Sequence, residues 1–111
     1  MSETPLEITV QDVQKLLTSE EKFLLLDCRE TDEFEAARIE GATLIPMGQI
    51  TSRVDELNDH IEGKIVVMCH LGGRSLRVTH WLRQNGFPQA QNMTGGIDAW
   101  SAEIDAEVPR Y

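Results

Sequence analysis

The sequence has few cysteines, few aromatic residues and a deficit of positive charge. Two cysteines stand among 111 residues, and Phe, Trp and Tyr together make up 5% of the chain. Ten Lys and Arg residues against 19 Asp and Glu residues leave a formal net charge of −9 at pH 7. An acidic chain of this kind is a poor match for nucleic acid or for an anionic membrane surface, so we expect neither as a partner.

Several patterns typical of other protein classes are also missing. The apolar runs are only a handful of residues long, too short for a transmembrane helix, and the N-terminal stretch does not resemble a secretory signal peptide. With two cysteines and no such signal, we expect reduced thiols in the cytoplasm. There is no C-x-x-C pair, no Cys/His cluster with zinc-ligand spacing and no Walker or GxGxxG phosphate loop. We therefore expect neither a metal ion nor another cofactor.

The remaining pattern is that of a small α/β protein. A chain of 111 residues with 41% hydrophobic residues suits one domain, which we expect to span residues 1–111 with irregular ends at 1–5 and 105–111. Predicted strands at 6–10, 23–26, 41–46, 65–68 and 90–93 alternate with predicted helices. Among these, residues 50–57 have helical spacing, and Thr9 with Asp12 predicts a helix N-cap. The alternation indicates a mostly parallel sheet with helices on both faces, and ligands bind such sheets beyond the carboxyl ends of their strands.

Residues 64–82 join an apolar strand, a glycine turn and a helix, and Cys69 stands where the strand stops. The loop continues with His70, Leu71, Gly72, Gly73, Arg74 and Ser75. Both glycines can adopt positive φ angles and turn loop N–H groups inward, so Gly73→Val is expected to damage the loop. The helix N-terminus and Arg74 add positive charge. We predict that Cys69 is a reactive thiolate, its pKa lowered from ~8.5 to roughly 3.5–7.5; the alternative is an inert buried cysteine.

The order of short motifs along the chain resembles the single-domain rhodaneses, a family of sulfurtransferases. The motifs are DCRE (27–30), EF (33–34), GA…IP (41–46), CHLGGRS (69–75) and GGIDAW (95–100). The resemblance implies a five-stranded parallel sheet flanked by helices, and a cysteine that carries sulfane sulfur as a persulfide. The chain departs from the family at Arg38, where many members have histidine, and at Cys28, where an aliphatic residue is common.

The resemblance also implies a reaction. Cys69 would attack the outer sulfur of thiosulfate or a persulfide donor and pass it from the Cys69 persulfide to a thiol or a cyanide-like acceptor. Inward loop N–H groups would stabilise both anions. A cysteine desulfurase upstream and a ubiquitin-like sulfur carrier downstream are candidate partners, since the motifs also resemble the rhodanese domain fused to some adenylating enzymes.

Supporting roles are expected on the loop and on the neighbouring strand end. Arg74 either binds an anionic donor or braces the loop through backbone carbonyls, and both alternatives remain open. His70 and Leu71 are expected to shape the loop mouth, with Gly72 and Gly73 as backbone requirements and Ser75 at the helix start.

Asp27 and Arg29 stand at the end of another predicted strand, so we expect them at the same edge of the sheet as Cys69, called the rim, where the carboxyl ends of the strands meet. We interpret both mainly as scaffold, with donor contact as a second role, and Arg29 is expected to pair with Glu33. Cys28 is interpreted as a small core residue; the alternative is that it resolves the Cys69 persulfide as an internal disulfide.

Two other functions compete with sulfur transfer. Cysteine phosphatases use a similar strand, loop and helix but have five residues between Cys and Arg, whereas four separate Cys69 from Arg74 here. The shorter ring is expected to suit sulfur better than a phosphoryl group. A binding module that kept the fold and lost the chemistry is the second alternative.

Overall fold

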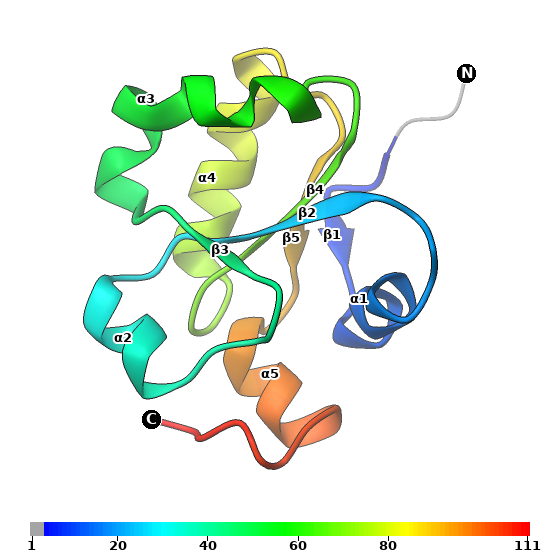
Figure 1. Ribbon diagram of the computed structural model, residues 1–111, viewed down its shortest axis with the longest axis vertical. Coiled ribbons are helices and arrows are strands. Elements are labelled where there is room, and N and C mark those ends of the chain that lie inside the picture. The colour runs from blue at the N-terminus through cyan, green and yellow to red at the C-terminus, as the bar shows by residue number, and fades with distance from the viewer. Residues whose placement is uncertain (1–3) are drawn as a thin grey trace.

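In the computed structural model of the protein, which describes residues 4–111, five strands form one sheet in the order β1-β5-β4-β2-β3 (Figure 1). The strands are β1 (Glu7–Ile8), β2 (Phe23–Asp27), β3 (Thr43–Leu44), β4 (Lys64–Met68) and β5 (Ala90–Met93). All neighbouring strands run parallel. The α/β architecture and the five-stranded parallel sheet are confirmed. Of the irregular end expected at residues 1–5, residues 1–3 lie outside the described part.

Helices connect the strands and cover the two faces of the sheet (Figure 1). They are α1 (Val10–Leu17), α2 (Thr31–Ala36), α3 (Ile50–Arg53), α4 (Gly73–Gln84) and α5 (Gly96–Glu103). The helix expected at 50–57 is α-helical only at 50–53 and continues as a 3₁₀ helix, Val54–His60. Val54 and Leu57 both pack toward the core, because their spacing of three matches the three residues per turn of a 3₁₀ helix. Within residues 4–111, no helix has the length and apolar character needed to cross a membrane.

The apolar run of β4 is explained by burial on both faces of the sheet. Val66 and Met68 belong to the core that the sheet shares with α1 and α5. Ile65 and Val67 point the other way, into the core that it shares with α3 and α4. Side chains of a strand alternate between the two faces, so a strand covered on both sides is apolar at every position.

The C-terminal segment after α5 is irregular but anchored. Val108 is buried in the core beneath α5, and its carbonyl accepts a hydrogen bond from Ser101 Oγ. Arg110 pairs with Asp98 near the start of α5, with Nε and Oδ1 2.9 Å apart. The segment therefore returns across α5 and ends beside α2 (Figure 1), where Tyr111 reaches Glu33.

Candidate active site

Cys69 directly follows β4, the middle strand of the sheet, and its side chain is only 1% exposed. Cys28 follows the neighbouring strand β2, and its N–H donates to the Met68 carbonyl at 3.0 Å. The segments 27–29 and 69–75 therefore meet at the same edge of the sheet, where the carboxyl ends of parallel strands lie together. Residues 69–75 are called the active-site loop below.

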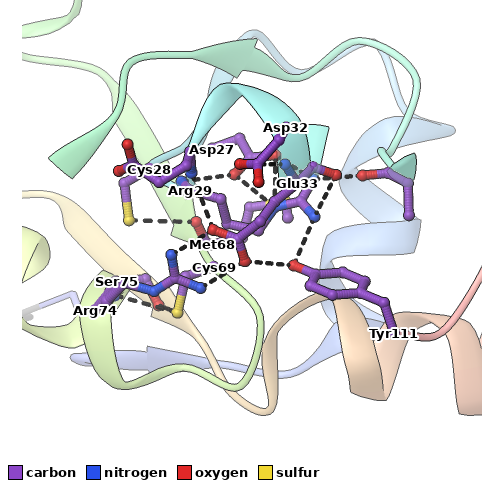
Figure 2. Close-up of polar contacts among 12 residues, drawn as sticks. Asp27, Cys28, Arg29, Asp32, Glu33, Met68, Cys69, Arg74, Ser75 and Tyr111 are labelled. Carbon is purple, nitrogen blue, oxygen red and sulfur yellow. Dashed lines mark hydrogen bonds and ion pairs between the residues drawn. The ribbon is translucent and has the colours of Figure 1, made fainter. Parts of the chain in front are cut away.

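Three hydrogen bonds from the active-site loop converge on the sulfur of Cys69. Gly72 N–H donates to Sγ at 3.1 Å. Ser75 donates to Sγ through its N–H at 3.4 Å and through Oγ at 3.3 Å (Figure 2). Gly72 has a φ angle of +107°, the conformation that turns its N–H back toward the sulfur. The inward-pointing arrangement expected from the sequence is present.

The expectation of a positive φ at both loop glycines is wrong for Gly73. Gly73 is the first residue of α4 and does not have a positive φ angle. A Cβ atom added there would meet nothing within 4 Å, so Gly73→Val has no steric reason to disrupt the loop. The conformationally sensitive glycine is Gly72.

Opposing effects determine the pKa of Cys69. Burial disfavours the thiolate, while hydrogen bonds from Ser75 and from the N–H groups of Gly72 and Leu71 favour it; together they lower the pKa below its ordinary value. Hydrogen bonding, and not the charge of Arg74, is thus the main source of the lowered pKa. A thiolate is the nucleophilic form of cysteine, so the arrangement suits nucleophilic sulfur chemistry.

The N-terminus of α5 holds the carbonyl groups of the active-site loop. Ile97 N–H donates to the Cys69 carbonyl at 2.9 Å, and Asp98 N–H donates to the His70 carbonyl at 3.1 Å. Gly96 permits this close approach, because it has a φ angle of +60° and a Cβ there would lie 2.4 Å from both carbonyl oxygens. The role of the GGIDAW motif is therefore to fix the loop backbone, which its position in the sequence did not reveal.

Asn92 on β5 links the active-site loop to the sheet. Its side-chain carbonyl accepts a hydrogen bond from Ser75 Oγ, and its amide group donates to the Glu7 carboxylate at 3.0 Å and to the Gly72 carbonyl at 3.3 Å. These acceptors fix which end of the amide faces Ser75. A hydroxyl carries one proton, so Ser75 donates either to Asn92 or to the sulfur of Cys69 at a given moment.

Arg74 braces the loop through a side-chain carboxylate. Its two terminal nitrogens bind both oxygens of Glu33 on α2, at 2.6 and 2.9 Å (Figure 2). The hydrogen bonds from Arg74 hold the pKa of Glu33 well below its usual range, at about 2, so this carboxylate is ionised at neutral pH. The geometry favours bracing over donor binding, although the partner is Glu33 and not the expected backbone carbonyls.

Asp27 and Arg29 form a buried ion pair beneath the rim, with no exposed side-chain surface. Arg29 binds both carboxylate oxygens of Asp27 and also donates to the Ala37 carbonyl at 2.6 Å. The expected side-chain pair with Glu33 is wrong, since Arg29 reaches only the backbone carbonyl of that residue. Burial leaves both residues as scaffold and gives no support to direct contact with a donor.

Tyr111 is also part of the site, and no pattern in the sequence identified it. Its hydroxyl donates to Glu33 Oε2 at 2.8 Å and accepts from Arg29 at 2.8 Å (Figure 2). Its ring stacks on His70, with ring centroids 4.2 Å apart and an angle of 14° between the planes. Leu71, the next loop residue, is 63% exposed. The mouth of the loop therefore presents aromatic and apolar side chains.

Cys28 lies in the core on the α4 side of the sheet. It is fully buried, its Sγ donates to the Met68 carbonyl at 3.5 Å, and burial raises its pKa to about 12. The pKa makes it a poor nucleophile at neutral pH, which favours its interpretation as a core residue over a resolving cysteine. Among the described residues there is no cluster of His, Cys, Asp and Glu that could hold a metal ion.

Comparisons with known proteins agree with this geometry. Residues 9–103 match the model of the rhodanese-like domain. The chain is 36% identical over 89 residues to the Rhodanese-like/PpiC domain-containing protein 12, chloroplastic, of Arabidopsis thaliana, covering 78% of this chain and 30% of that protein. It is 33% identical over 109 residues to the Adenylyltransferase and sulfurtransferase MOCS3-1 of Zea mays, covering 94% and 23%. The chain thus spans less than a third of the length of either relative.

Solved structures give the same result. A rhodanese-like domain protein from Staphylococcus aureus superposes with a TM-score of 0.78 and 29% identity, covering 96% of this chain and 99% of the other. The family model covers residues 9–103 and the solved structure covers 96% of the chain, so the protein belongs to the rhodanese-like domain family.

Proposed function

We propose that this protein is a sulfurtransferase in which Cys69 accepts a sulfane sulfur atom and carries it as a persulfide. The observation that carries the proposal is that the N–H groups of Gly72 and Ser75 point at Cys69 Sγ, joined by the Ser75 hydroxyl when it is not donating to Asn92; these donors stabilise an anionic sulfur. The family supports sulfur transfer in general, as does the name of the maize relative, an adenylyltransferase and sulfurtransferase.

The proposed reaction has two steps. The Cys69 thiolate attacks the outer sulfur of thiosulfate or of a persulfide donor; the donor's S–S bond breaks and sulfite or a thiolate leaves with the electron pair. An acceptor thiolate or cyanide then attacks the terminal sulfur of the Cys69 persulfide and releases the Cys69 thiolate. The loop N–H groups stabilise the anion at both stages, so no metal ion is required in this scheme.

Partners and compartment are part of the proposal. A cysteine desulfurase upstream and a ubiquitin-like carrier downstream fit a Cys69 persulfide as alternatives to small molecules. Both cysteines are free, which is compatible with a reducing cytoplasm.

The structure offers two arguments against the competing functions. A phosphatase needs its loop arginine to bind the phosphoryl oxygens, but Arg74 is already bound at both terminal nitrogens by Glu33. A binding module without chemistry has no need for a thiol with a lowered pKa.

Cys69→Ser separates these functions, because a serine hydroxyl does not hold a sulfane sulfur. With thiosulfate or a persulfide as donor and cyanide as acceptor, wild-type protein is expected to form thiocyanate, and Cys69→Ser is expected to form none. Cys28→Ser is the matched control and is expected to keep activity. Thiocyanate formation by Cys69→Ser would overturn the mechanism, and aryl phosphate hydrolysis that depends on Cys69 would replace it with phosphatase chemistry.

A further inference from the structure

The arginines around the active-site loop are all bound to carboxylates. The pairs are Arg74–Glu33, Arg29–Asp27 and Arg110–Asp98, with closest N···O distances of 2.6, 2.7 and 2.9 Å. Paired charges present little net field to an approaching ion, and the field that remains is screened within about 10 Å by salt. The guanidinium groups of Arg74, Arg29 and Arg110 are therefore each compensated by a carboxylate.

Two further arginines, Arg77 and Arg38, lie against other residues. Arg77 lies one turn along α4 and lines a depression together with Met47 and Trp81. Arg38 follows α2 and lies over the ring of Phe34, 5.2 Å from its centroid. The net charge of −9 over the whole chain repels a dianion at long range.

The outermost side chain of the loop is apolar. Leu71 is 63% exposed, the highest exposure of any large hydrophobic residue within the part of the chain that the structure describes. It follows His70 in the chain, whose ring stacks on that of Tyr111, and Tyr111 is 46% exposed. A donor that approaches Cys69 therefore meets a partly apolar surface at Leu71, where a dianion would need a cation.

We infer that the active-site loop takes its sulfur from an organic persulfide and that Leu71 is the residue that disfavours thiosulfate. This inference rests on the proposed function and narrows its donor class. The Cys69 thiolate attacks the outer sulfur of R–S–SH, the donor S–S bond breaks, and R–S⁻ leaves with the electron pair while Cys69 becomes Cys69–S–SH. One negative charge enters with the thiolate and leaves on R–S⁻. The thiosulfate reaction must instead bring a dianion to the loop and release sulfite, also a dianion.

The test compares two donors on variants that differ only in where one positive charge is added. The donors are thiosulfate and the persulfide of N-acetylcysteine methyl ester, whose organic group is uncharged. The variants are wild type, Leu71→Arg and Ile61→Arg. Ile61 is 40% exposed and lies shortly before the start of β4, at the end of the sheet opposite Cys69, so Ile61→Arg changes the net charge equally at a remote place. The readout is the rate at which Cys69 gains one sulfur atom, measured by intact mass spectrometry.

Dividing each variant's ratio of the two loading rates by the wild-type ratio cancels the different intrinsic reactivities of the donors. Leu71→Arg is expected to raise the thiosulfate rate relative to the persulfide rate by about tenfold, and Ile61→Arg is expected to leave the ratio at the wild-type value. Added salt is expected to increase the wild-type thiosulfate rate, because it screens repulsion. An unchanged ratio in Leu71→Arg, or a wild-type thiosulfate rate that falls with salt, would overturn the inference alone. If neither donor loads wild-type Cys69, the proposed function itself is wrong.

Discussion

Replacement of Gly96 by alanine tests whether α5 holds the active-site loop in its reactive conformation. The new Cβ would lie 2.4 Å from the carbonyl oxygens of Cys69 and His70. Both atoms belong to the backbone and cannot rotate aside as a flexible side chain would. The loop and the start of α5 must therefore move apart, which weakens the hydrogen bonds from Ile97 and Asp98 to these carbonyls.

The expected magnitude follows from these contacts. A left-handed conformation costs alanine about 1–2 kcal/mol, and each weakened hydrogen bond costs about 1 kcal/mol. Gly96→Ala is therefore expected to lower the free energy of unfolding by about 3–4 kcal/mol. Gly86→Ala is the matched control, because Gly86 also has a positive φ angle, +100°, but a Cβ there would meet nothing within 4 Å. It is expected to lose only the conformational part, about 1–2 kcal/mol.

Two measurements separate the variants. Urea denaturation gives the free energy of unfolding, and the rate of alkylation by iodoacetamide as a function of pH gives the pKa of Cys69. Gly96→Ala is expected to raise that pKa, since displacement of the loop moves the N–H groups of Leu71 and Gly72 away from the sulfur. Gly86→Ala is expected to leave the alkylation profile unchanged. If both variants have the same stability and the same profile, the proposed role of α5 is refuted.

Three further outcomes are expected. Ser75→Ala removes a hydroxyl that donates to Cys69 Sγ, and a hydrogen bond to a charged group is worth about 1.5–3 kcal/mol, so alkylation should report a raised pKa of Cys69; an unchanged profile contradicts this. The pKa of Glu33 is lowered from 4.5 to about 2, so its ionised carboxylate stabilises the folded state by up to about 3 kcal/mol above about pH 5. This stabilisation is lost as the pH falls toward 2, and acid denaturation of Glu33→Gln should lack this component. Tyr111→Phe keeps the ring but removes a donor to Glu33, and urea denaturation should show a loss of about 1 kcal/mol, whereas no loss would mean that the hydroxyl contacts are unimportant.

The fold and the reactive loop were predictable because their signals are local. The apolar run of β4, the glycine at position 72 and the helix that follows are consecutive in sequence, so strand, turn and helix could be placed without knowledge of the tertiary structure. Alternation of strands and helices then indicated a parallel sheet. The prediction of a positive φ angle at Gly73 was wrong, because glycine permits a positive φ without requiring it.

The supporting contacts were not predictable because they join distant parts of the chain. Arg74 and Glu33 are 41 positions apart, and Tyr111 and Glu33 are 78 apart. Glu33 has the spacing of a helical partner for Arg29, and that expectation failed because the buried Asp27 binds the guanidinium of Arg29 instead. Gly96 and Asn92 reach the active-site loop only through the packing of α5 and β5 against β4. Such contacts depend on tertiary geometry, which periodicity does not report.

The central claim is that Cys69 carries sulfane sulfur, and intact mass spectrometry after exposure to an organic persulfide or to thiosulfate tests it most directly. Wild-type protein is expected to gain the mass of one sulfur atom, which cyanide or dithiothreitol removes, and Cys28→Ser is expected to behave in the same way. Cys69→Ser is expected to gain nothing. A wild-type protein whose mass stays unchanged with both donors, or a Cys69→Ser variant that acquires the same removable sulfur, would contradict the claim.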